Sequence, residues 1–268
     1  MDEIAICFFG ITRSLRHTMP SIEANVLTPA RAQGRIRIYA HFFRQMHVRN
    51  LRSGENGAAD PEEHHLLGCD WLRLEEPDAC LSTWSFDTLK RSGDAWHDDF
   101  ASLRNVVHQQ HSLRQVTLAA LADGAKVCLF CRPDLRYHDS LARPITRAIK
   151  ARNSLVQLPR WQAWEGGLND RFALCSGEEA IRAYGTRIEQ AANYCALRGP
   201  LHAERLLAYA LREADIPVRR ISTRAGRVRV DGHERHEDFL PPSLSFMRST
   251  LRNAAIGVLR SLGLRKRA

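Results

Sequence analysis

Continuous apolar runs and amphipathic stretches alternate along most of this chain. Residues 3–10 and 126–131 are apolar almost throughout, which is typical of strands buried on both faces of a parallel sheet. Residues 102–124 instead place Leu and Val at helical spacing, and Gly124 provides a stop. These two kinds of segment predict buried strands connected by helices that cover them.

The same two patterns recur through the rest of the chain. A helix from about Pro20 is expected after the first strand. The other predicted strands are 35–43, 154–159, 172–176, 216–222 and 226–232, and the other predicted helices are 140–152, 177–196 and 201–215. Strands that alternate with helices predict an α/β fold, with one Rossmann-type domain whose mostly parallel central sheet is flanked by helices.

Two segments depart from this alternation. Residues 44–100 are rich in turn formers and charge, and predict a loop-rich insertion or lid within a domain that spans residues 1–240. Within them, residues 68–78 carry a weak strand pattern. Residues 241–268 mix Leu, Phe and Ile with Arg at helical spacing. This tail fits either a basic amphipathic helix on an anionic membrane surface or a terminal helix packed on the domain.

Composition adds a preference for anionic partners. The 268-residue chain has a formal net charge of +9 and a pI of about 9.6, and most of its basic residues are Arg. A guanidinium group suits phosphate well, so nucleic acid, acidic lipid or a phosphorylated substrate would each fit this charge. The sequence has no transmembrane-length apolar run, and Asp2 and Glu3 stand where a secretion signal would be basic. We therefore expect a cytoplasmic protein, with the tail as the feature that would hold it on the inner membrane.

A Cys-x-x-Cys pair, Cys128 and Cys131, suggests a thiol site at first sight. A structural zinc site needs four ligands, and the sequence contains no second pair. Residues three apart on a strand point to opposite faces, so these two thiols cannot easily hold one ion. The seven cysteines are scattered and odd in number, which favours reduced, mostly buried thiols over a disulfide framework.

The polar residues after the predicted strands are the better candidates for chemistry, because α/β proteins bind ligands beyond the carboxyl ends of their strands. Arg132, Asp134 and Asp139 follow the strand at 126–131. A carboxylate there can hold Mg²⁺ or Mn²⁺ against a diphosphate, and an Arg can contact the same phosphates. A salt-bridged turn is the alternative. After the first strand, Gly10 allows close backbone approach, and Thr12 and Arg13 offer donors.

A third cluster lies at residues 161–176, where two Trp and a Gly pair precede an Asn-Asp-Arg sequence. Trp faces commonly contact sugar rings, which makes Trp164 a candidate sugar contact. Asp170 is a candidate general base at the mouth of a pocket. A rigid loop with core Trp residues and a surface salt bridge is the alternative.

Several blocks together resemble a family of bacterial GT-A-type glycosyltransferase-like proteins associated with surface polysaccharide synthesis. "IAICFFGITRSL" is similar to the family's first strand and nucleotide loop, "RIYAHFF" to its second strand, and "RNVVHQQHSLRQV" to the helix before its metal-site strand. "FCRPDLRYHDSL" resembles an Arg-x-Asp version of the Asp-x-Asp motif. "LNDRFALCSGEEAIRAYG" is the most specific block, and "PLHAERLLAYALREADIPVRRI" resembles the closing helix and strand.

The resemblance implies a nucleotide-sugar donor, a divalent cation and transfer to a saccharide or a lipid-linked acceptor. It also implies roles for particular residues. Gly10, Thr12, Arg13, Arg132 and Asp134 would bind the nucleotide sugar, with Asp134 as metal ligand; Asp170 and Glu204 would be catalytic; Trp164, Arg171 and His202 would contact the acceptor or sugar. The chain departs from the family where Arg132 replaces the first Asp of the motif.

Two other functions are compatible with the sequence. A non-catalytic, basic nucleotide- or nucleic-acid-binding protein would explain the +9 charge, although a nucleic-acid motif is absent and aromatic residues make up only 7%. A sulfo- or phosphotransferase on a similar sheet is the second, and the missing phosphate-binding loop argues against it.

Overall fold

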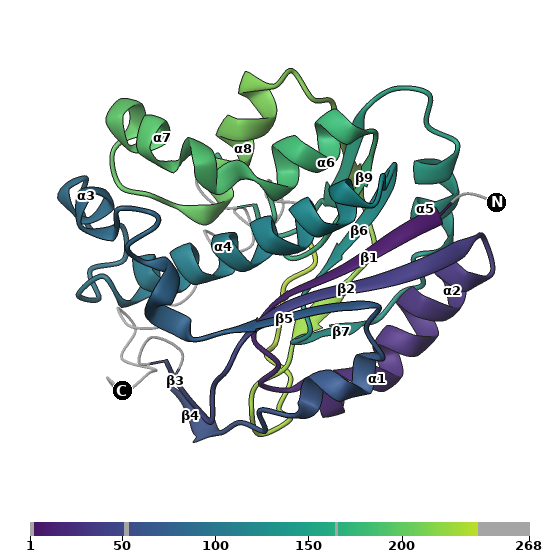
Figure 1. Cartoon of the computed structure of the whole chain (residues 1–268), viewed down its shortest axis with the longest axis horizontal. Helices are drawn as coiled ribbons and strands as arrows, with labels where there is room; N and C mark the ends of the chain where they lie inside the picture. Colours follow the sequence, from purple (N-terminus) through teal and green to yellow (C-terminus); the bar gives the residue numbers. More distant parts are fainter. Residues whose placement is uncertain (1–2, 51–53, 164–165, 241–268) are drawn as a thin grey trace, which may run out of the picture.

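The computed structural model describes residues 3–50, 54–163 and 166–240 and contains a central seven-stranded sheet (Figure 1). The strand order in this sheet is β10-β8-β9-β6-β1-β2-β5. These strands are β1 (Glu3–Gly10), β2 (Arg35–Phe43), β5 (Trp71–Glu75), β6 (Val127–Cys131), β8 (Leu155–Pro159), β9 (Ala173–Ser176) and β10 (Val218–Ile221). Two small antiparallel pairs accompany it: β3 (His47–Asn50) with β4 (Glu55–Ala58), and β7 (Leu135–Tyr137) with β11 (Ala225–Arg227).

Helices cover both faces of the sheet (Figure 1). One face is covered by α1 (Leu15–Ile22), the π-helical turn η1 (Glu23–Leu27), α2 (Thr28–Arg31) and α5 (Ala142–Ile149). The other is covered by α4 (Ala101–Ala122), α6 (Glu178–Gly185) and α8 (Ala203–Glu213), with α3 (Phe86–Arg91) and α7 (Ala191–Arg198) packed at one end. Short 3₁₀ turns lie at Glu63–Leu67, Pro77–Cys80 and Arg187–Gln190.

The sheet is parallel except around one strand. β1 pairs in parallel with both β2 and β6, β2 with β5, and β8 with β10. Only β9 runs antiparallel to its neighbours β6 and β8. The predicted fold class, an α/β domain with a mostly parallel central sheet flanked by helices, is therefore confirmed.

The strand β1 is apolar almost throughout because it is buried on both faces of the sheet. Ile4, Ile6 and Phe8 pack into the core beneath α1 and α5, whereas the alternate residues pack beneath α4 and α6. The same alternation separates the two cysteines of β6: Cys131 lies in the first core and Cys128 in the second. All seven thiols are free and most are buried, as the sequence predicted.

Two sequence expectations need correction. The first helix begins at Leu15 and contains Pro20, and a π-helical turn follows at Glu23–Leu27. The helix expected over 177–196 is broken after Gly185, which packs closely on Thr117 of α4. The weak strand pattern at 68–78, within the expected insertion, corresponds to β5, an edge strand of the main sheet. No helix in the described part of the chain is long and apolar enough to cross a membrane. The predicted tail at 241–268 lies outside the described residues.

Candidate functional site

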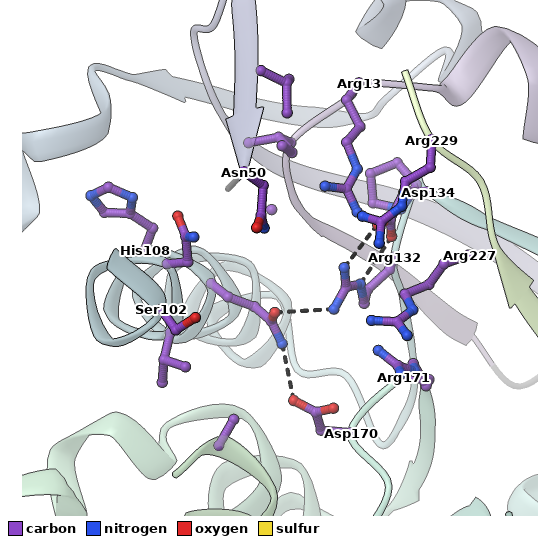
Figure 2. A pocket seen from close by; sticks show the side chains of 18 of the residues that line it. Arg13, Asn50, Ser102, His108, Arg132, Asp134, Asp170, Arg171, Arg227 and Arg229 are labelled. Atoms are coloured by element: carbon purple, nitrogen blue, oxygen red, sulfur yellow. Dashed lines mark hydrogen bonds and ion pairs between the residues drawn. The ribbon is translucent and has the colours of Figure 1, made fainter. Parts of the chain in front are cut away.

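A cleft of about 820 Å³ lies beyond the carboxyl ends of β1 and β6 (Figure 2). Its walls come from the loops after these strands, from α4, from the start of α8 and from the β3–β4 hairpin. Parallel strands bring their carboxyl ends to one edge of the sheet, so Gly10 and Asp134 reach the same cleft although they are far apart in sequence.

Asp134 lies at the centre of an ion-pair cluster. Arg132 donates to both of its carboxylate oxygens, from Nε to Oδ1 at 2.9 Å and from Nη2 to Oδ2 at 2.8 Å. Arg13 also donates to Oδ2 from the loop after β1. Asp134 is only 2% exposed. Burial alone would raise the pKa of this carboxyl, but the Arg132 and Arg13 guanidinium groups outweigh burial and hold the pKa well below its usual range.

Sequence reasoning missed the partners that complete this cluster. Glu55 of β4 accepts from Arg13 at 3.0 Å and from Arg229 at 2.7 Å, and its other oxygen accepts from the backbone N–H of Val230. The N–H of Val228 binds the carbonyl of Asp134 at 2.8 Å, which fixes the segment after β11 against the loop after β6. The alternating Arg residues of "GRVRVDG" indicated a strand, but they did not indicate which side chains these Arg residues would pair with.

A second group of basic residues faces the cleft from β11 and the loop before β9. Arg171 donates to Oε1 of Gln162 at 3.1 Å and forms no ion pair among the described residues. Arg227 donates to Glu237 at 2.8 Å, and Glu237 also accepts from Gln162. Burial and the nearby Arg132 charge lower the pKa of Arg171. Burial and the Arg171 charge likewise lower the pKa of Arg227.

Asp170 is connected to Arg132 by a single side chain of α4. Gln109 accepts from Nη1 of Arg132 at 3.1 Å and donates to Oδ2 of Asp170 at 3.2 Å (Figure 2). Asp170 is 6% exposed, lines the cleft and is not ion-paired among the described residues. Gln109 stands within a block that marked the resemblance, but the sequence did not single it out.

The start of α8 closes the opposite wall. His202 and Glu204 line the cleft, and the His202 ring stacks on Trp96 with centroids 5.1 Å apart. Gly167 packs against the backbone of Glu204, where an added Cβ would lie 2.7 Å from the carbonyl carbon. Gly167, the second residue of the Gly pair seen in the sequence, is therefore needed for close packing of this loop on α8.

Most of the predicted site residues gather in this cleft, but not all of them do. Gly10, Arg13, Arg132, Asp134, Asp170, Arg171, His202 and Glu204 line it. Thr12 is buried and does not line the cleft. Asp139 is bound by Arg224 outside the cleft, as in a salt-bridged turn. Trp164 lies outside the described residues, and its neighbour Trp161 is a core residue that donates to the carbonyl of Thr223.

The residues around Asp134 do not fit a divalent cation. Both carboxylate oxygens already accept from guanidinium groups, and Arg229 approaches the same cluster through Glu55. A metal ion would have to displace these hydrogen bonds and then lie among positive charges. The proposal of Asp134 as metal ligand therefore has no support from its surroundings.

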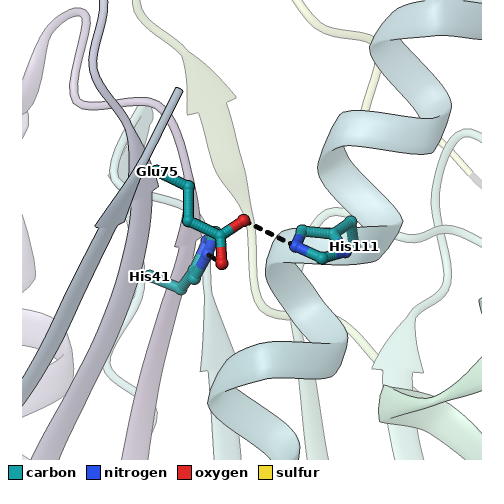
Figure 3. Close-up of side chains that lie close together, drawn as sticks. All are labelled: His41, Glu75 and His111. Carbon is teal, nitrogen blue, oxygen red and sulfur yellow. Dashed lines mark hydrogen bonds and ion pairs between the residues drawn. The ribbon is translucent and has the colours of Figure 1, made fainter. Parts of the chain in front are cut away.

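A separate buried group, His41, Glu75 and His111, offers three ligand atoms within 4.8 Å of one another (Figure 3). Trp84 donates its indole N–H to Nδ1 of His111 at 3.0 Å, so the neutral ring carries its proton on Nε2, which lies 2.8 Å from Glu75. Neither nitrogen of His111 then has a lone pair for a metal. This group is better described as a hydrogen-bonded network than as a metal site.

Comparisons with known proteins give distant structural likeness only. No family model and no curated protein matches the sequence. Mouse xyloside xylosyltransferase 1 in its apo form is 10% identical, with 83% of this chain and 86% of that chain covered and a TM-score of 0.40. The galactosyltransferase LgtC, in complex with donor and acceptor sugar analogues, is 10% identical, with 78% and 70% covered and a TM-score of 0.41. A Bacillus anthracis protein described as a glucose-1-phosphate thymidylyltransferase, in complex with sucrose, is 9% identical, with 84% and 89% covered and a TM-score of 0.37. No residue role is carried over from structures this distant.

Proposed function

We propose that this protein is a glycosyltransferase that moves a sugar from a nucleotide-sugar donor to a saccharide or lipid-linked acceptor. One observation carries the proposal: Gln109 joins Arg132, at the centre of the basic cluster, to Asp170, a buried carboxylate without an ion-pair partner among the described residues. Arg132, whose guanidinium group can stabilise a departing phosphate, and Asp170, which can act as base for an attacking hydroxyl, are thus separated by the Gln109 side chain alone.

The chemistry of transfer needs both groups. In an inverting transfer, the acceptor oxygen bonds to the anomeric carbon and gives its proton to Asp170. The bond from that carbon to the phosphate oxygen breaks, and its electron pair stays on the nucleoside diphosphate. Guanidinium groups that line the cleft stabilise this growing negative charge. A carboxylate in contact with the acceptor hydroxyl accelerates the proton transfer, typically by about 10²–10⁴-fold.

The other predicted roles in the cleft remain part of this proposal. Gly10 and Arg13 would contact the nucleotide, Glu204 is the second candidate catalytic residue, and His202 lines the side where a sugar or acceptor would enter. Basic residues concentrated inside a cleft of about 820 Å³ favour a small anionic ligand over nucleic acid, which would need an extended basic surface. Membrane attachment through the tail and a role in surface polysaccharide synthesis rest on the sequence alone.

The first test is thermal stabilisation of the purified protein by uridine, guanosine, cytidine and thymidine diphosphates and their common sugars. A ligand that binds only the native state raises the melting temperature by mass action. We expect one nucleotide family to stabilise the protein more than the others do. Stabilisation by none of them would contradict the proposal, and a response to adenine nucleotides alone would favour a sulfo- or phosphotransferase.

The second test addresses Asp170 without knowledge of the acceptor. Slow release of nucleoside diphosphate, with water as acceptor, reports on the same proton transfer. Asp170→Asn should lower this rate at least about 100-fold while nucleotide-induced stabilisation persists. Asp139→Asn, which alters an aspartate outside the cleft, is the matched control and should leave the rate unchanged. A normal rate in Asp170→Asn would remove this residue from the mechanism.

A further inference from the structure

Three guanidinium groups face one region of the cleft, and each reaches it from a different segment of the chain. Arg132 follows β6, Arg171 precedes β9 and Arg227 ends β11 (Figure 2). All three are largely buried: Arg171 is 8% exposed, and the side chains of Arg132 and Arg227 are each 16% exposed. Buried charges that converge in this way are costly unless something compensates them.

Compensation within the described residues is incomplete. Arg132 shares Asp134 with Arg13, and Arg227 has Glu237. Among the residues that the structure describes, the Arg171 side chain hydrogen-bonds only to the neutral amide of Gln162. Repulsion shows in the pKa values of two of the three: burial first and then Arg132 lower the pKa of Arg171, and burial first and then Arg171 lower the pKa of Arg227. For Arg132, burial is outweighed by the Asp134 charge, which raises the pKa. A guanidinium group stays protonated at neutral pH, so the cluster keeps an excess positive charge.

The hydrogen-bond geometry leaves these groups arranged for an oxyanion. Asp134 holds Arg132 through two parallel hydrogen bonds, at 2.9 and 2.8 Å, and so fixes the plane of that guanidinium group. Gln162 accepts a hydrogen bond from Arg171 and donates one to Glu237, and Glu237 in turn accepts from Arg227. Fixed, planar donors with excess positive charge suit a phosphate group that carries more than one negative charge.

We propose that Arg132, Arg171 and Arg227 form a diphosphate subsite that binds the donor's two phosphates through guanidinium groups alone, without a divalent cation. This inference rests on the proposed function for the identity of the donor. Asp134 is then a positioning residue for Arg132 and Arg13 instead of a metal ligand. Arg171, which the sequence assigned to the sugar or acceptor, contacts the phosphates.

The decisive experiment is binding of nucleoside diphosphates and of inorganic pyrophosphate, measured by calorimetry in EDTA and again with Mn²⁺. We expect the affinity of the preferred nucleotide to be the same in the two buffers. Arg171→Gln should weaken it by about tenfold to a hundredfold, the loss expected for charge-assisted hydrogen bonds. Arg224→Gln, which removes an exposed Arg outside the cleft, is the matched control and should bind normally.

A second readout separates this role from a structural one. Arg171→Gln removes a buried charge that has no ion-pair partner among the described residues, so the ligand-free variant should melt at a higher temperature than the parent protein. A residue needed only for folding would lower the melting temperature when replaced. Higher stability together with weaker binding would therefore support the subsite.

The outcomes distinguish this inference from the proposed function. Nucleotide binding that disappears in EDTA and returns with Mn²⁺ would overturn the metal-free subsite and leave the transferase proposal standing. Metal-free binding that Arg171→Gln does not weaken would overturn the subsite as well. If pyrophosphate binds through Arg171 and nucleosides add no affinity, the subsite stands and the nucleotide-sugar donor is wrong. Binding of neither ligand would remove both.

Discussion

Two carboxylates in this molecule each lie between two basic side chains, at the carboxyl ends of two strands of the central sheet, β6 and β5. Asp134 lies between Arg13 and Arg132, and Glu75 lies between His41 and His111. In the first cluster the carboxyl has a pKa far below its usual range and both guanidinium groups are charged. In the second, burial lowers the pKa of His41 to about 4, and burial also lowers that of His111.

Burial acts differently on imidazole and on guanidinium groups. An imidazole can release its proton when it is taken out of water, so the two histidines become neutral, and Glu75 keeps a charge that Arg73 balances. A guanidinium group cannot do so, and its charge has to be balanced by carboxylates or by a ligand. Ser112 connects the histidine cluster to the end of β1, from which the loop that carries Arg13 starts: its hydroxyl accepts from the N–H of Gly10 at 2.8 Å and donates to the carbonyl of His41 at 2.7 Å.

The largest expected effect comes from breaking the arginine cluster. Asp134→Ala leaves Arg13 and Arg132 buried without this partner and should lower the free energy of unfolding by about 3–5 kcal/mol. The matched control is Asp139→Ala, because Asp139 also binds one Arg through two oxygens but the pair is exposed. It should cost at most about 1 kcal/mol in urea unfolding. Equal losses in the two variants would mean that water screens the cleft cluster.

Removing the connection through Ser112 should have the next largest effect. Ser112→Ala deprives the buried Gly10 N–H and His41 Nδ1 of their shared partner and should lower the free energy of unfolding by about 2 kcal/mol. Ser82→Ala, at an exposed position, is the control and should be neutral in the same urea titration. If Ser112→Ala is also neutral, the histidine cluster and the end of β1 are not coupled through this hydroxyl.

Acid should weaken the histidine cluster before the arginine cluster. The folded pKa of His41 is about 4, below the ordinary value of about 6.5, so the unfolded chain takes up a proton first as pH falls. Stability should therefore drop by about 2 kcal/mol between pH 7 and pH 5 on account of His41. His41→Gln should flatten this slope, whereas His65→Gln, at an exposed site, should not. An unchanged slope in His41→Gln would assign the loss to other groups, of which His108, with a pKa also lowered to about 4 by burial, is the first candidate.

The smallest expected effect concerns the tautomer of one ring. Trp84→Phe removes the N–H that binds Nδ1 of His111 and should cost about 1 kcal/mol. Nitrogen NMR should find the His111 proton on Nε2 in the parent protein. In the variant, a fraction of the molecules should carry a proton on Nδ1 as well. A proton on Nδ1 in the parent protein would contradict the network and reopen the metal interpretation of His41, Glu75 and His111.

The sequence by itself determined the layered architecture. Apolar runs that fill two cores, such as β1 and β6, can be recognised because a buried strand is apolar on both faces. The separation of Cys128 from Cys131 and the delivery of Gly10, Arg132 and Asp134 to one edge follow from strand geometry alone. The helix boundaries near Pro20 and Gly185 were harder to predict from the sequence, because packing against other elements overrode the local preference for or against helix.

Only the tertiary structure decided which charges meet. Arg13 and Asp134 are 121 positions apart, and Arg229 and Glu55 are 174 apart. The alternation of apolar and polar residues tells whether a side chain points inward, but it carries no information about which distant side chain it will face. The occupation of Asp134 by guanidinium groups, the placement of Arg171 against the amide of Gln162 and the neutral state of His41 and His111 therefore depend on contacts that form only when the sheet is assembled.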